Sequence, residues 1–93
     1  MSTGLHEQVK KDFGQLLKAA RERAGYRSAA RLALILGVEP ARYRYWERGQ
    51  ALPDIPTFVK LCHQLRVDPI DLVPSFIREK PNGKQVDHLK VVT

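Results

Sequence analysis

Three arginines and two tyrosines are interleaved around the single tryptophan in the stretch GVEPARYRYWERG, residues 37–49. A guanidinium presents a planar fork of N–H donors, which can pair with both acceptors on the major-groove edge of guanine or with a phosphate. The same arginines could instead only solvate a helix whose aromatic side chains are packed inside. The positions of these residues around the predicted helix help to decide between the two interpretations.

A helix is predicted to begin at Pro40, because proline is favoured at the first helical position, and to end at Gly49. At 100° per residue, Tyr43, Trp46 and Glu47 point to one side, which favours packing against a core. The opposite side and its flank carry the candidate contact residues for an external ligand. These residues are Ala41, Arg42, Arg44, Tyr45 and Arg48.

Four further helices must position this one. Apolar spacing predicts a first helix over residues 7–24, closed by Gly25. Ser28 caps a second helix that ends before Gly37, while Asp54 and Asp68 cap a fourth and a short fifth, the last stopped by Pro74. The fourth helix has five residues that are expected to face inward. They are Phe58, Val59, Leu61, Cys62 and Leu65.

The second and third predicted helices are short and are separated only by Gly37 and the few residues after it. This is the helix-turn-helix pattern, in which a tight turn leaves the second helix projecting. Glu47 lies on the inner side of that projecting helix, where a carboxylate needs a partner. Arg21 and Arg23, late in the first helix, are the candidates for this structural salt bridge.

The chain is predicted to divide into three parts. Residues 1–6 carry no pattern and are expected to be frayed and flexible, and residues 7–74 form the helical domain. Residues 75–93 form a C-terminal tail in which Pro81-Asn82-Gly83 signals a turn before the β-prone residues 86–92. The tail is compatible with a hairpin, a single strand or a flexible segment, and with a role in dimerisation or partner binding.

The charge balance favours a polyanionic partner, either nucleic acid or an anionic membrane surface. The formal net charge is +6 and the isoelectric point about 9.8, and the span from residue 21 to residue 48 alone carries a net charge of +4. Four residues around the second and third helices are candidate phosphate contacts, which would position the protein without reading sequence. They are Arg27, Ser28, Arg31 and Arg48.

Catalysis, a metal site and a bound cofactor are not expected. His6, His63 and His88 lie far apart in the sequence, and no metal-ligand spacing, phosphate loop or nucleophile motif occurs. Cys62, the single cysteine, lies in an apolar run and is interpreted as a small buried hydrophobe. No apolar run approaches the length of a membrane span, and the first residues lack the apolar core of a secretory signal.

At this point the sequence resembles the Cro/C1-type helix-turn-helix family, also called the XRE family. The resemblance covers about residues 13–73, through FGQLLKAARERAGY, LALILGV, YRYWERG and TFVKLCHQLRVDPIDLV. It implies an all-α, five-helix, lambda-repressor-like domain that binds operator DNA, usually as a dimer, with the third helix in the major groove. It also implies that Arg21 is the partner of Glu47. One departure is Arg66, which stands where relatives frequently have glycine.

The base-reading positions that the resemblance implies are Pro40, Ala41, Arg44 and Tyr45, with Arg42 beside them. The sequence therefore predicts a sequence-specific regulator of transcription, a repressor that binds a palindromic operator in double-stranded DNA as a homodimer in the cytoplasm, where it associates with the nucleoid. An alternative is an antitoxin or interaction module whose tail binds a protein partner. The tail residues expected to make such contacts are apolar. They are Phe76, Ile77, Val86, Leu89, Val91 and Val92.

Overall fold

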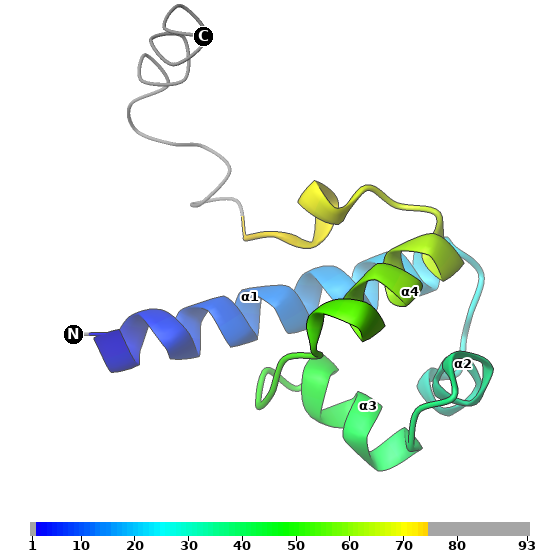
Figure 1. The fold of residues 1–93 in the computed structure, drawn as a ribbon, viewed down its shortest axis with the longest axis horizontal. Coiled ribbons are helices and arrows are strands. Elements are labelled where there is room, and N and C mark those ends of the chain that lie inside the picture. The colour runs from blue at the N-terminus through cyan, green and yellow to red at the C-terminus, as the bar shows by residue number, and fades with distance from the viewer. Residues whose placement is uncertain (1, 75–93) are drawn as a thin grey trace, which may run out of the picture.

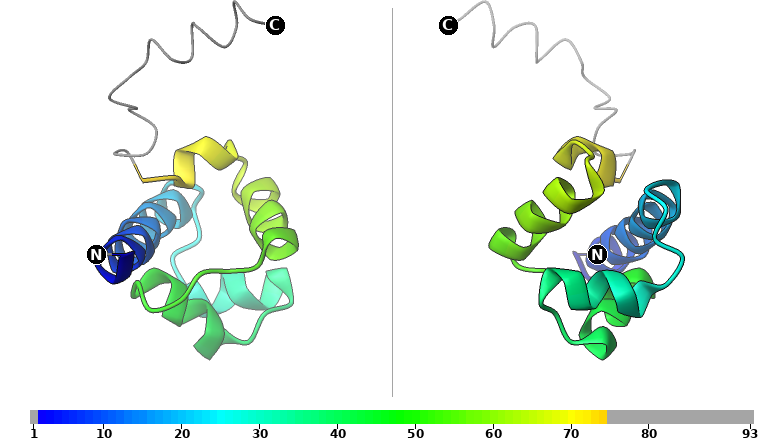
Figure 2. Two further views of the ribbon diagram at one scale, coloured as in Figure 1. Left: turned by 60° about the vertical axis from the view of Figure 1, so that its left-hand side comes forward. Right: turned by 90° about the vertical axis from the view of Figure 1, so that its right-hand side faces the viewer.

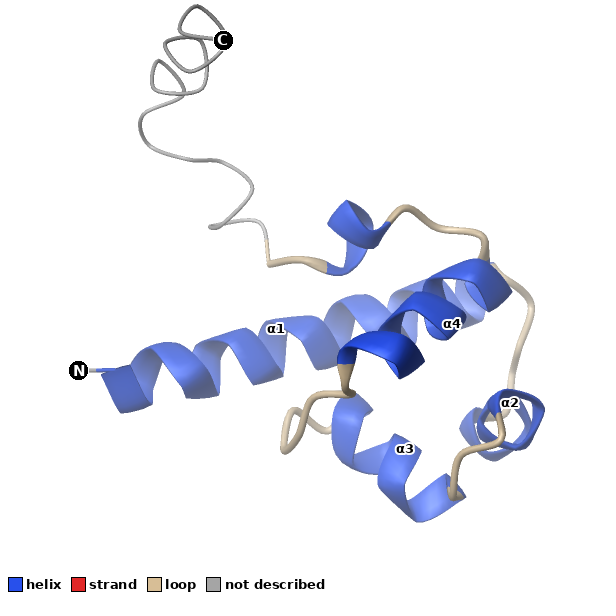
Figure 3. Ribbon diagram, viewed as in Figure 1, coloured by secondary structure: helices blue, strands red, loops and turns tan. Residues whose placement is uncertain are grey.

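The computed structural model of the protein describes residues 2–74, which form four α-helices and one short 3-10 helix (Figure 1). The elements are α1 (Ser2–Arg23), α2 (Ala29–Leu36), α3 (Pro40–Glu47), α4 (Ile55–Leu65) and η1 (Pro69–Leu72). No strand occurs among these residues, as the colouring by secondary structure in Figure 3 shows. The predicted all-α class is confirmed, whereas the strand or hairpin considered for the tail falls on residues 75–93, outside the described part of the chain.

The helices surround a single core. Figure 2 shows α1 and α4 on opposite sides of the domain, with α2 and α3 at the end farthest from η1. Helix α3 packs against both α1 and α2, while η1 packs back against α1. The third helix is thus held from two directions, and its remaining side is left for solvent or a ligand.

The largest fully buried side chains, Trp46 and Tyr43, both come from α3. Their rings meet edge to face with centroids 5.5 Å apart, a geometry that aromatic quadrupoles favour. The other core residues come from every remaining helix. They are Phe13, Leu17, Ala20, Leu32, Ala33, Leu36, Leu61, Cys62, Leu65 and Leu72. Because α3 contributes the bulkiest part of the core, its inner face is fixed by packing.

Two of the helix starts are capped as the sequence predicts. The Ser28 side-chain oxygen accepts a hydrogen bond from the backbone N–H of Arg31 at 3.1 Å. The Asp54 carboxylate accepts one from the backbone N–H of Thr57 at 2.9 Å. Each cap satisfies one of the N–H groups that the first helical turn leaves without an intrahelical partner.

All four α-helices end in the same way, with a left-handed residue and two backbone hydrogen bonds that satisfy the last carbonyls. Gly25, Gly37 and Gly49 supply the left-handed residue for α1, α2 and α3. Arg66 does so after α4, with a φ of 59°, although a side chain makes this conformation costly. Arg66 therefore stands where relatives frequently have glycine and still adopts the left-handed backbone conformation.

Three expectations differ from the structure. Residues 2–6, expected to be frayed, continue α1 to Ser2. Val59, expected to face inward, is 56% exposed because it lies about 100° around α4 from Phe58. The fifth helix is of the 3-10 type, since only a few residues separate its cap from Pro74.

Gly14 lies where α1 meets the end of α3, and replacing it should destabilise the domain. A Cβ at Gly14 would sit 2.6 Å from the carbonyl oxygens of both Trp46 and Glu47. Because backbone must move to admit it, Gly14→Ala should lower the free energy of unfolding by roughly 1–3 kcal/mol. Chemical denaturation measures this change.

Gly4→Ala is the matched control, because nothing lies within 4 Å of a Cβ at Gly4 in the same helix. Alanine has the higher helix propensity, so this variant should be neutral or slightly stabilised. The predicted close approach of α1 and α3 would be refuted by a Gly14→Ala protein as stable as the Gly4→Ala protein.

The cap at Asp54 should make stability depend on pH in the acid range. Its hydrogen bonds with Thr57 hold the pKa of the Asp54 carboxyl below the ordinary value of 3.8. A carboxyl whose folded pKa is lowered contributes stability above its unfolded pKa, and this contribution is lost as pH falls through the folded pKa. Asp54→Asn keeps a capping oxygen but does not titrate, so it should lose less stability than the parent protein below about pH 4.

Thermal unfolding followed across this acid range checks the prediction, with the difference between the two proteins as the readout. Other carboxyl groups titrate in both and cancel in that difference. Parallel pH profiles for the parent and Asp54→Asn would show that the cap carries no charge-dependent stability.

Candidate nucleic-acid interface

The predicted tight turn joins α2 to α3. Gly37 closes α2 in the left-handed conformation, and the N–H of Val38 returns to the carbonyl of Ala33 at 2.8 Å. Pro40 then opens α3 at its first helical position. Because a proline has no N–H and a fixed φ, it suits a position where the helix leaves N–H groups unpaired. The result is a short, rigid connection that sets the direction of α3.

Helix α3 has two different faces. Tyr43 and Trp46 are buried and Glu47 is largely buried, as the helical spacing predicts. The outer face consists of exposed residues, including Tyr45 with 49% of its surface accessible. The full outer set is Ala41, Arg42, Arg44, Tyr45 and Arg48. The structure therefore places these five predicted contact residues on the exposed side of α3, whereas Pro40, also a predicted base-reading position, is half-buried at the start of the helix.

A buried ion pair fixes the inner face of α3 to α1. The Arg21 side chain donates to the Glu47 carboxylate through Nε at 2.7 Å and through Nη2 at 3.3 Å. The Tyr43 hydroxyl donates to the same carboxylate at 2.7 Å. Arg21 and Glu47 have only 7% and 12% of their side chains exposed. Burial of this kind is tolerated because the carboxylate and the guanidinium find several partners each.

The same guanidinium also holds the loop between α1 and α2. Its Nη1 atom donates to the backbone carbonyls of Tyr26 at 2.8 Å and Arg27 at 2.7 Å. This loop carries Arg27 and Ser28, two of the predicted phosphate contacts. One buried charge thus positions the start of α2 and the inner face of α3 together.

The contacts with Glu47 shift the pKa values of Tyr43 and Arg21 in the same direction. Burial raises the pKa of the Tyr43 phenol, and its hydrogen bond to Glu47 raises it further. The hydrogen bond to Glu47 raises the pKa of Arg21 above its ordinary value. Tyr43 therefore remains a donor and Arg21 remains charged throughout the physiological range. The hydroxyl of Tyr43 is a contribution that the sequence analysis missed, although its position four residues before Glu47 was a usable signal.

The four predicted phosphate contacts all lie on the surface. Arg27, Ser28 and Arg31 are exposed around the start of α2, and Arg48 is exposed at the end of α3. The free N–H groups of a helix start attract anions, and the Ser28 hydroxyl can still donate its own hydrogen. Since Glu47 is neutralised by Arg21, the exposed charge of the α2–α3 region is strongly positive.

Residues 2–74 carry no sign of a membrane-spanning helix or of a metal site. No helix there is both long and apolar enough to cross a membrane, and no group of three metal-ligating side chains lies close together. Cys62 is buried, and burial raises the pKa of its thiol. This favours the packing interpretation of Cys62 over a reactive one.

Removing the buried charge should cost far more stability than removing an exposed one. Arg21→Met keeps much of the side-chain length but leaves Glu47 buried without its cation, so the free energy of unfolding should fall by roughly 3–5 kcal/mol. Arg23→Met, two residues away in the same helix but exposed, should change it by no more than about 0.5 kcal/mol. Urea denaturation of both variants makes the comparison, and equal losses would contradict it.

Comparison with known proteins identified a family and several similar solved structures. A family model described as "Helix-turn-helix domain" matches residues 12–74. No curated protein sequence matches the chain significantly. The restriction-modification controller protein C.AhdI from Aeromonas hydrophila superposes with a TM-score of 0.61 and is 31% identical, over 67% of this chain and 92% of that one. The overlap thus includes nearly the whole controller protein.

A second similar structure is that of Fe(II) HppE in complex with its substrate, with 28% identity and a TM-score of 0.64. The match covers 71% of this chain but only 34% of that chain, so it concerns about a third of HppE. The family match, in contrast, covers both α2 and α3 and the turn between them. Together with the capped helices, the glycine-closed turn and the Arg21–Glu47 pair, these comparisons place the chain in the helix-turn-helix domain family, as a DNA-binding regulator of the Cro/C1 (XRE) type.

Proposed function

We propose that the protein is a sequence-specific regulator that reads the major groove of double-stranded DNA with α3. The supporting observation is the division of this helix into two faces. Its inner face is fixed by Tyr43, Trp46 and Glu47, while every outer residue is exposed next to a tight turn. An α-helix fits the major groove of B-DNA, and a helix held from behind can enter it without losing its orientation.

The four base-reading residues have complementary roles in this proposal. Arg44, in the middle of the outer face, is placed to pair with the two acceptors of a guanine, and Arg42 flanks it. Tyr45 offers a ring for a thymine methyl group and a hydroxyl for a phosphate. Ala41 is small, so the start of α3 can approach the base edges closely.

The phosphate contacts would position the helix on the duplex. Arg27, Ser28 and Arg31 lie at the start of α2, and Arg48 lies at the far end of α3. The two groups can therefore contact DNA phosphates on either side of the major groove. Such contacts carry most of the salt-dependent affinity and little sequence information. Because Arg21 holds both the α2 entry and α3, the spacing between the two groups is set inside the protein.

Binding as a homodimer to a palindromic operator is also proposed. Two copies would present their α3 helices about 34 Å apart, one turn of DNA. The likeness to a restriction-modification controller protein supports a regulatory role, and occupation of promoter DNA would make the outcome repression. The alternative of an antitoxin rests on the tail, and residues 75–93 lie outside the described structure, so it stays a prediction.

Arg44→Ala should weaken binding to the selected operator by about 1–3 kcal/mol and relax the preference at one base position. The operator would first be obtained by selecting bound duplexes from a random pool at a fixed salt concentration. Arg23→Ala is the matched control, because Arg23 is exposed and lies half a turn around α1 from Gly14, which faces α3. It should bind almost as the parent protein does.

Two results would count against the proposal. One is an Arg44→Ala protein that binds operator and random DNA as tightly as the parent. The other is a selection that yields salt-steep binding but no motif, which would indicate binding without sequence reading. A recovered palindrome, in contrast, would establish sequence preference and dimer geometry in a single experiment.

A further inference from the structure

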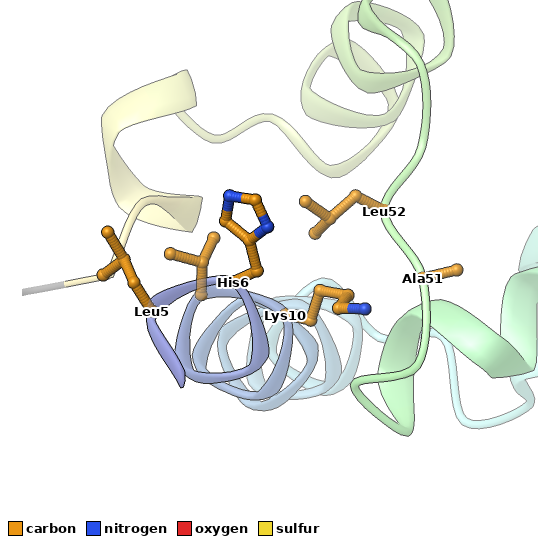
Figure 4. Close-up of a pocket in the computed structure, with 6 residues that line it drawn as sticks. Leu5, His6, Lys10, Ala51 and Leu52 are labelled. Carbon is orange, nitrogen blue, oxygen red and sulfur yellow. The ribbon is translucent and has the colours of Figure 1, made fainter. Parts of the chain in front are cut away.

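An apolar groove lies between α1 and the segment that follows α3. One part is a hollow of about 460 Å³ between the first half of α1 and the loop at Ala51 and Leu52. Figure 4 shows the His6 and Leu52 side chains pointing toward each other across it. A second hollow of about 280 Å³ shares Val9 and Leu52 with the first and continues toward η1. The two hollows are therefore neighbours along α1, and together they are called the groove below.

The second hollow is lined only by apolar residues. Val9 and Phe13 of α1 form one wall, and Ile55 and Phe58 of α4 form another. Around its rim, Ile55 is 73% exposed and Leu52 is 46% exposed. Exposed apolar surface that is gathered in a groove, unlike single scattered residues, commonly marks a contact with another segment or molecule.

The chain itself leaves the described structure from the edge of this groove. Residues 72–74 line the second hollow, and Pro74 is the last described residue. The sequence continues as Ser75-Phe76-Ile77-Arg78-Glu79-Lys80, with two large apolar residues directly after the exit point. Two residues span at most roughly 7 Å, so a groove occupant that begins at Ser75 needs no long connection.

We propose that the segment formed by residues 75–80 is the occupant of this groove, with the Phe76 ring in the hollow between Phe13 and Ile55. The short connection to Pro74 favours this segment over a separate molecule, because a tethered group is present at a high effective concentration. The two apolar residues of the segment, Phe76 and Ile77, match the apolar lining of the second hollow, while the charged residues after Ile77 can remain in solvent. The docked segment would tie α1, the loop after α3 and α4 together.

This docking leaves the proposed DNA-binding surface free. The groove is formed by α1, the loop after α3, α4 and residues 72–74, and none of its lining residues belongs to the outer face of α3. Figure 1 shows η1 and α3 at different ends of the domain. Docking of this segment would therefore stabilise the domain whether or not the protein binds DNA.

A double-mutant cycle on the full chain tests the contact. Phe76→Ala should lower the Tm by roughly 4–8 °C, the shift expected when a small domain loses a well-packed apolar contact. Ile55→Ala should lower it in the parent protein and have much less effect once Phe76 is already alanine. Val92→Ala, at the far end of the tail, is the control and should show no coupling to Ile55→Ala.

Three results would overturn the proposal. One is an unchanged Tm for Phe76→Ala, and another is strict additivity of Phe76→Ala and Ile55→Ala. The third is a coupling that disappears at low protein concentration, which would mean that the tail of a second copy fills the groove. In a methyl-labelled sample, NMR contacts between the Phe76 ring and the Ile55 or Val9 methyl groups should appear, and they should persist unchanged when labelled protein is diluted with unlabelled protein.

Discussion

The arrangement of the domain depends on how the buried guanidinium of Arg21 is satisfied. Its donors reach the Glu47 carboxylate in α3 and the carbonyls of Tyr26 and Arg27 in the loop before α2. A charge removed from water must find such partners, so these three parts of the chain cannot move independently without a large energetic cost. The Tyr43 hydroxyl donates a further hydrogen bond to the Glu47 carboxylate from the core side. Within residues 2–74, no buried side-chain polar atom is left without a hydrogen-bond partner.

A second constraint acts through the backbone. Gly14 brings α1 against the carbonyls at the end of α3, and a Cβ on Gly49, just beyond that end, would lie 2.8 Å from the Cα of Lys11. The ion pair sets the rotation of α3, because it involves side chains on one face. The close approach sets how near α3 lies to α1, because only a residue without Cβ fits at the contact. Together they determine which residues of α3 reach solvent.

Local chemistry explains what the sequence could predict. The caps at Ser28 and Asp54 and the glycine ends of three helices depend on neighbouring residues, so they could be identified without the fold. Val59 was misassigned because helical spacing gives the direction of a side chain but not the width of the buried face. Gly14 gave no local signal, since its role is a contact with residues more than thirty positions away. The base that Arg44 is proposed to read depends on the DNA partner, which the protein sequence does not contain.

The packing at Gly14 also bears on how the protein could be altered. At Gly14 the main-chain carbonyl groups at the end of α3 lie directly against α1, and main-chain groups are the same whatever side chains the outer face carries. Exchanges at Ala41, Arg44 or Tyr45 should therefore leave the pose of the helix intact. Under the proposed reading of DNA by α3, such a domain would suit retargeting, because a library of outer residues could be screened for new operators while the inner face of α3 stays constant. The same separation would let recognition diverge among relatives while the fold stays conserved.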